Sequence, residues 1–186
     1  MAKRVSRFRG VAALLLGAAG AGAAVDLAVA KNTDVSACGY SASIPGDPQY
    51  FRVNQVDPFG RSGVIEGAET ILGQAGYIRF SCFRPDSLGA PPRKEQAIVQ
   101  LFEYTKGLGI RKQTYQYQES NGRVSLLLNG ERNFADQVYA VRMEFQFQRS
   151  FTLSLITSRR VGDRKTAVAV DEFIESFRLG RADVKR

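Results

Sequence analysis

The chain of 186 residues contains no histidine and no tryptophan, and it has only two cysteines. Imidazole is the commonest general base in enzymes and a principal zinc ligand. Its absence excludes serine–histidine and cysteine–histidine hydrolases and all histidine-ligated metal sites. We therefore expect no catalytic residues, no metal site and no cofactor.

An enzyme built from this chain would have to rely on carboxylates. A glycosidase needs two acids about 5 to 10 Å apart in one cleft, and the candidates are Glu66, Glu69, Glu131, Asp136 and Glu144. Neither the Glu66–Glu69 pair nor the Glu172–Glu175 pair has the acidic density of a calcium loop. A carboxylate-based hydrolase acting on polysaccharide or a small molecule is therefore the alternative function.

Residues 1–30 have the three-part pattern of a secretory signal peptide. A basic start is followed by an apolar run over residues 11–25, and small-residue exits end at Ala24 and Ala30. The apolar run is shorter than the roughly 20 residues that span a bilayer. We expect cleavage and export to the periplasm or the cell exterior. An uncleaved N-terminal membrane anchor is the alternative.

The formal net charge of the chain is +8, and the leader carries four of the 26 basic and one of the 18 acidic residues. The remainder is therefore basic at +5, a balance that suits an anionic surface or an acidic protein patch. It lacks the dense charge stripe of a nucleic-acid binder, and export makes nucleic acid a poor partner. We expect no nucleic-acid binding.

Cys38 and Cys82 both follow the leader, so an oxidising compartment favours a disulfide between them. Closing a loop of about 45 residues would stabilise the fold by ~4 kcal/mol in the chain-entropy model. The alternative is that residues 35–38, Val-Ser-Ala-Cys, form a lipoprotein cleavage box with a lipidated Cys38. Polar residues separate this box from the apolar run, where such a box should follow directly.

The rest of the chain is predicted to consist mainly of strands, with two amphipathic helices. Alternation is clearest over 138–148, where large apolar residues occupy every second position. Asn121-Gly122 is the strongest hairpin signal, and Asn129-Gly130 predicts a second turn. Apolar residues at helical spacing predict a helix over about 94–106 and a closing helix over about 167–177. The pattern predicts an α+β fold, a single antiparallel sheet of about six strands flanked by two helices.

This order of elements resembles the PsbP-like superfamily, which includes an extrinsic photosystem subunit, a Ran-binding import factor and many exported bacterial domains. The resemblance covers roughly Gly39 to Leu179. It rests on the opening strand at residues 40–46, Tyr-Ser-Ala-Ser-Ile-Pro-Gly, and on the closing Phe-Ile-Glu-Ser-Phe-Arg-Leu at 173–179. It implies the sandwich architecture and an accessory or binding role, but no particular site residue.

A basic cluster precedes the closing helix. Four cations fall within seven residues, with one acid, Asp163, among them: Arg159, Arg160, Arg164 and Lys165. A loop between sheet and helix is well placed to meet a partner, although a charged loop can also be merely solvated. We interpret the cluster as a docking patch.

The expected domains are a signal peptide over 1–30, a flexible segment over 31–37, a single α+β domain over 38–179 and a charged tail over 180–186. The expected function is that of a non-enzymatic exported accessory or binding domain. Its predicted partner is an envelope or membrane-associated protein, or an anionic surface.

Overall fold

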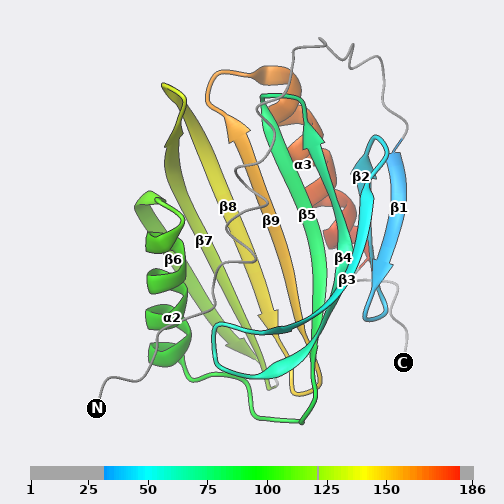
Figure 1. Ribbon diagram of the computed structural model, residues 1–186, viewed down its shortest axis with the longest axis vertical. Coiled ribbons are helices and arrows are strands. Elements are labelled where there is room, and N and C mark those ends of the chain that lie inside the picture. Colours follow the sequence, from blue (N-terminus) through cyan, green and yellow to red (C-terminus); the bar gives the residue numbers. More distant parts are fainter. Residues whose placement is uncertain (1–31, 121, 181–186) are drawn as a thin grey trace.

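The computed structural model describes residues 32–120 and 122–180. The predicted signal peptide, its cleavage positions and the charged tail beyond Gly180 lie outside the described residues. Within them the fold is α+β with antiparallel strands and two helices, as expected. The predicted single sheet of about six strands is wrong, because the structure has one sheet of seven strands and a separate sheet of two (Figure 1).

The seven-stranded sheet has the order β3-β4-β5-β9-β8-β7-β6 and is antiparallel throughout. Its strands are β3 (Gln49–Val56), β4 (Ser62–Leu72), β5 (Gly76–Pro85), β6 (Arg111–Ser120), β7 (Arg123–Phe134), β8 (Gln137–Phe147) and β9 (Thr152–Arg160). The hairpin predicted between β6 and β7 agrees with the pairing of Ser120 with Arg123, although Asn121 itself lies outside the described residues. The turn predicted at Asn129-Gly130 is wrong, since both residues lie inside β7. Gly130 serves close packing instead: a Cβ there would lie 2.5 Å from the Ile110 side chain.

The segment over 31–37 was expected to be flexible, but residues 32–37 form strand β1 (Asn32–Ala37). It pairs with β2 (Tyr40–Pro45) through a two-residue turn in which Cys38 and Gly39 both have positive φ. Val35 and Ala37 of β1 are buried. Residues 32–37 are ordered because Val35 and Ala37 add apolar side chains to the core, a contribution that the mostly polar composition of the segment did not indicate.

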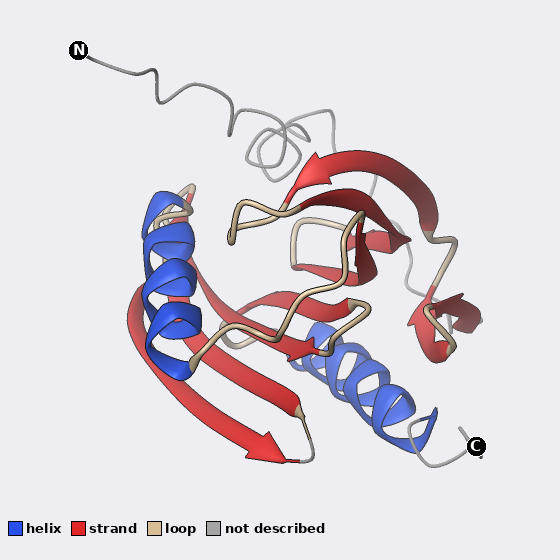
Figure 2. Cartoon of the chain, turned by 90° about the horizontal axis from the view of Figure 1, so that it is seen from below, coloured by secondary structure: helices blue, strands red, loops and turns tan. Residues whose placement is uncertain are grey.

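The two helices cover opposite faces of the curved sheet (Figure 2). The first, α2 (Lys94–Gly107), lies on the inner face near β6, β7 and β8, and the second, α3 (Arg164–Gly180), lies on the outer face. The β1–β2 hairpin packs beside α3. Phe173 and Phe177, four residues apart on α3, are fully buried.

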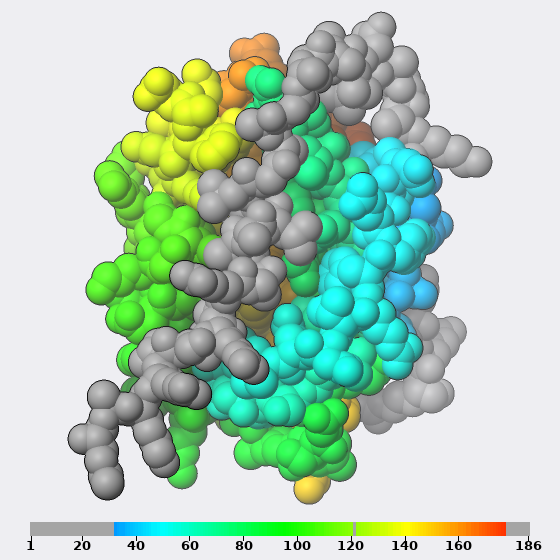
Figure 3. All heavy atoms as spheres, viewed as in Figure 1, coloured from blue at the N-terminus to red at the C-terminus, as the bar shows by residue number. Residues whose placement is uncertain are grey.

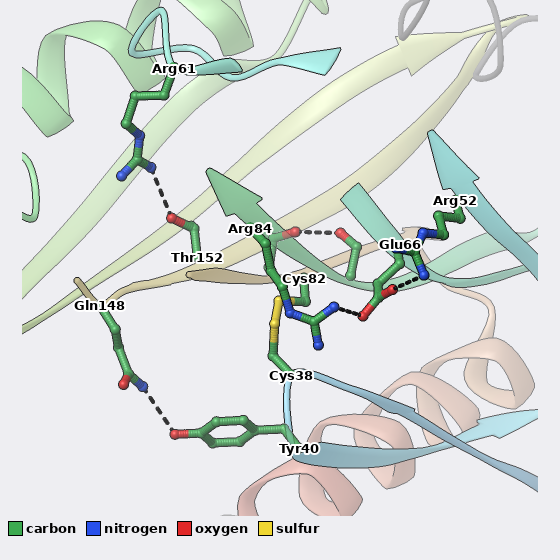
Figure 4. The surroundings of a disulfide bond; sticks show 11 residues. Cys38, Tyr40, Arg52, Arg61, Glu66, Cys82, Arg84, Gln148 and Thr152 are labelled. Atoms are coloured by element: carbon green, nitrogen blue, oxygen red, sulfur yellow. Dashed lines mark hydrogen bonds and ion pairs between the residues drawn. A yellow bond between two sulfur atoms is a disulfide. The ribbon is translucent and has the colours of Figure 1, made fainter. Parts of the chain in front are cut away.

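The predicted disulfide between Cys38 and Cys82 is present, with a Cα–Cα separation of 6.0 Å. It joins the β1–β2 turn to β5 (Figure 4). A Cys38 sulfur held in this bond has no thiol left for lipidation, so the lipoprotein alternative does not fit. Disulfides persist in oxidising compartments.

On the inner face, two glycines of β4 let the sheet bend sharply. A Cβ at Gly63 or Gly67 would lie within 2.2 Å of a backbone oxygen of β5, so any larger residue would force the strands apart. The bend carries the β3–β4 turn toward α2, where Phe59 packs edge-on against Phe147 with ring centroids 5.3 Å apart.

No helix among the described residues has the length and apolarity to cross a membrane.

Candidate functional site

Three connections of the chain meet at one end of the molecule. The backbone N–H of Val161, after β9, donates at 2.8 Å to the carbonyl of Val138, the second residue of β8 next to the β7–β8 turn. The N–H of Arg160 donates to the Ala75 carbonyl in the β4–β5 turn at 2.6 Å. Figure 3 shows these connections side by side at the top of the molecule. We call this region, together with the first turn of α3, the basic end.

All four predicted basic residues lie at the basic end, but they are not equivalent. Arg159 approaches Asp171 at 3.9 Å, and Arg160 pairs with Asp163 at 3.3 Å. Arg164 and Lys165 are exposed and form no ion pair with any described residue. The cations available to a partner are therefore chiefly Arg164 and Lys165.

Asp163, the acid within the predicted patch, caps α3. Its Oδ1 accepts the backbone N–H of Thr166 at 3.0 Å, the usual bond of an N-cap side chain. This hydrogen bond is the main cause that holds the pKa of Asp163 below its ordinary value. The carboxylate is therefore committed to the helix and to Arg160.

The two free cations occupy an unfavourable position for the helix. Arg164 and Lys165 form the start of α3, and its first turn contains no acid. The helix dipole places partial positive charge there, so each cation destabilises the helix by roughly 0.3–1 kcal/mol. Asp163 at the N-cap is the acid nearest to them, but neither cation forms an ion pair with it or with any other described residue, which favours a role in binding.

Exposed apolar side chains lie among these charges, and the sequence analysis did not identify them. Phe134 and Val138 flank the β7–β8 turn, and Val161 follows β9; they are 44%, 39% and 58% exposed. The Arg132 guanidinium lies 6.0 Å from the centroid of the Phe134 ring. Val161 is far from the other two in the sequence, so only the tertiary structure brings it beside Val138.

The candidate carboxylates do not converge. Glu66 and Glu69 point to opposite faces of β4, because they are three residues apart on one strand. Each of four candidates has a basic partner: Glu66 pairs with Arg52 and Arg84, Glu69 with Arg79, Glu131 with Lys112, and Glu144 with Arg142 (Figure 4 for Glu66). The described residues contain no cluster of three or more potential metal ligands.

A pocket of about 80 Å³ lies on the inner face, at the end of the molecule opposite the basic end. The β3–β4 turn and α2 form its walls, and the sheet forms its floor. Its lining is mostly apolar: Gln55, Asp57, Pro58, Phe59, Ile65, Phe83, Leu101, Phe145, Phe147, Thr152 and Ser154. It is about half the volume of a cavity that holds benzene, so it suits only a small apolar group.

The β3–β4 turn above this pocket is held by Asp57. Its Oδ1 accepts the backbone N–H groups of Phe59 and Arg61, both at 2.9 Å, and its Oδ2 accepts from the Arg61 side chain at 2.7 Å. Arg61 also donates to Thr152 on β9 at 3.1 Å (Figure 4). The Nη1 of Arg61 is buried and has no hydrogen-bond partner among the described residues.

Between the pocket and the basic end, the inner face carries a polar network. The Tyr77 hydroxyl donates to Glu69 at 2.7 Å, and the Arg79 guanidinium lies 3.5 Å from Glu69 and 4.2 Å from the Phe51 ring centroid. Burial is the main cause that raises the pKa of Tyr77, with Glu69 adding to the shift and Arg79 opposing it. The hydroxyl therefore stays protonated and acts as a donor that fixes Glu69.

A hydrogen-bonded serine pair lies on the floor of the inner face. Ser81 of β5 and Ser154 of β9 face each other in the sheet register, with their hydroxyl oxygens 2.7 Å apart. Both side chains are buried. Each serine satisfies the other, and no histidine exists to activate either as a nucleophile.

Comparison with known proteins adds no family to these observations: no family model matches the chain, and no curated protein is significantly similar to it.

Proposed function

We propose that this protein is a non-enzymatic exported binding domain that docks through its basic end on an anionic component of the cell envelope. The observation that carries the proposal is the pair of free cations, Arg164 and Lys165, at the N-terminal turn of α3. They weaken the helix and have no partner among the described residues. Negative charge on a partner would interact favourably with both cations and so outweigh their unfavourable interaction with the helix dipole.

Two further observations support the proposal. The Cys38–Cys82 disulfide is typical of an oxidising, exported compartment, in agreement with the leader expected from the sequence. Four of the five candidate carboxylates sit in ion pairs, an arrangement typical of structural charges. The resemblance to the PsbP-like superfamily stays a prediction, and an accessory role is what it implies.

The test measures binding of the mature protein to isolated envelope fractions by sedimentation. The docking variant is Arg164→Glu with Lys165→Glu. The matched control is Arg93→Glu with Lys94→Glu, which makes the same charge change at the exposed start of α2.

Charge reversal at α3 should weaken binding mainly through the association rate, and added salt should weaken the wild type in the same way. The control should bind like wild type. Equal losses in both variants would indicate a dependence on net charge alone, without a defined surface. Unchanged binding in the docking variant would refute the proposal.

A further inference from the structure

We propose that the anionic partner of the basic end is a lipid bilayer, into whose headgroup region Phe134, Val138 and Val161 insert. This inference rests on the proposed function and adds the chemical class of the partner. It also assigns a role to apolar side chains that the charge argument leaves unused.

The three side chains lie at the same end of the molecule, and we call them the apolar tip. Phe134 pairs with Gln137 and Val138 with Asn133, so Phe134 and Val138 project from opposite faces of the hairpin end, and both would enter a bilayer that the end of the hairpin penetrates. Phe134 and Val138 stand on either side of the Ala135–Asp136 turn, where β7 passes into β8. Val161 is held beside Val138 by the 2.8 Å backbone hydrogen bond from its N–H to the Val138 carbonyl. Figure 3 shows both connections projecting at the same end of the molecule.

Cations surround the apolar tip. Arg132 lies beside Phe134, and Arg160 precedes Val161. Arg164 and Lys165 are the first two residues of α3, three and four positions after Val161. The acids of this region are few: Asp163 is committed to the cap of α3 and to Arg160, and Asp136 lies in the β7–β8 turn. Exposed apolar side chains among Lys and Arg are the usual composition of surfaces that bind at the membrane interface.

A bilayer fits this surface better than an acidic protein patch. Charge alone would satisfy an acidic protein, and the apolar tip would then remain in water. A protein partner that used the tip would have to receive three side chains on projecting turns. An anionic bilayer offers negative charge at its surface and an apolar layer beneath it, so it satisfies both sets of residues at once.

Each cation and each apolar side chain is expected to contribute little to membrane binding alone, but together they should suffice for binding. Each Lys or Arg near an anionic bilayer raises the partition coefficient by about fivefold, and one weak anchor alone gives only marginal membrane binding. Loss of either the charges or the apolar tip should therefore bring binding to vesicles close to background.

The absence of tryptophan from the chain makes a direct test possible. Phe134→Trp places the only indole at the apolar tip. Phe102→Trp is the matched control, because Phe102 is 48% exposed on α2, away from the basic end. With vesicles rich in phosphatidylglycerol, the emission of the 134 variant should shift to the blue and be quenched by brominated acyl chains. The 102 variant should show neither change.

A second set of variants separates the contributions. Phe134→Ser with Val138→Asn and Val161→Asn should reduce vesicle binding by tenfold or more. Val99→Asn with Phe102→Ser removes comparable exposed apolar surface from α2 and should leave binding unchanged. Thermal unfolding of every variant distinguishes loss of binding from loss of the fold.

Three outcomes decide between the claims. An unshifted emission at residue 134 on vesicles that sediment the protein would overturn insertion while leaving electrostatic docking intact. Binding to envelope fractions that depends on Arg164 and Lys165, with no binding to lipid vesicles, would identify a protein partner and overturn the bilayer. Envelope binding that is indifferent to Arg164 and Lys165 would refute the proposed function itself.

Discussion

On the outer face of the sheet, α3 and the β1–β2 hairpin enclose a closely packed core, whereas on the inner face α2 leaves a pocket and an exposed flank. The largest fully buried side chains belong almost entirely to the outer cluster: Phe80, Phe173, Phe177, Ile44, Ile78 and Leu153. The disulfide lies in the same cluster. On the inner side, Val99 and Phe102 of α2 remain exposed beside the buried Leu101.

This difference teaches that stability and binding are placed in different parts of the molecule. The outer face holds the fold through apolar burial and a covalent bond. At the basic end Asp163 caps α3, whereas Arg164 and Lys165 oppose the helix dipole. Changes at the outer face should therefore lower stability most, and replacement of the two exposed cations should weaken binding without lowering stability.

The largest stability effect is expected at Phe173. Truncation of this fully buried ring by Phe173→Ala should lower the free energy of unfolding by about 3–5 kcal/mol. Phe102→Ala, on the exposed flank of α2, should change it by less than about 0.5 kcal/mol. Denaturant unfolding of both variants measures the contrast, and similar losses would show that the two faces contribute alike.

Removal of the disulfide should have the next largest effect. Cys38→Ala with Cys82→Ala should cost between about 2 and 4 kcal/mol, because the unfolded chain regains the freedom of a long loop. Reduction of the wild type should produce the same destabilisation. A change of only a few tenths of a kcal/mol would mean that the hairpin is held by packing alone.

The serine pair on the inner face should show strong coupling. Ser81→Ala or Ser154→Ala alone leaves a buried hydroxyl without its partner and should cost about 1–3 kcal/mol. The double variant should cost less than the sum of the two, since it removes both polar groups. Additive losses in this double-mutant cycle would contradict the pairing.

The cap of α3 should give a smaller effect that depends on pH. Asp163→Ala should cost about 1 kcal/mol at neutral pH. Because the pKa of Asp163 is lowered in the folded protein, its charge stabilises the fold above the ordinary aspartate pKa, and this contribution is lost as the pH falls through the folded value. Asp163→Asn keeps a capping oxygen without the charge, so its unfolding should lack this acid-dependent component.

Sequence patterns predicted most of the fold because burial on one face imposes its period on each strand and helix. Alternation over 138–148 and the helical spacing of Phe173 and Phe177 are direct consequences of that burial. The patterns failed where a residue served a tertiary purpose. Gly130 indicated a turn but allows β6 to approach β7, and the real turn at Ala135–Asp136 has positive φ without glycine.

The candidate site could be predicted only in part, for a related reason. The four cations are contiguous in sequence, so their cluster was visible. The sequence did not show which of the four have an ion-pair partner, because the Arg159–Asp171 contact depends on how α3 packs against the sheet. In the apolar tip, Val161 lies beside Val138 through a backbone hydrogen bond between the end of β9 and the start of β8, which no local pattern predicts. The pocket under Phe59 depends on a bend at Gly63 and Gly67 that no local pattern reveals.

The separation of stability from binding is tested most directly by measuring both quantities on the variant Arg164→Glu with Lys165→Glu. Acidic side chains in the first turn suit the helix dipole, so thermal unfolding should show stability equal to wild type or raised by about 1 kcal/mol. Binding of the same preparation to envelope fractions should fall sharply. A variant that binds as well as wild type, or that loses binding and stability together, would contradict the account.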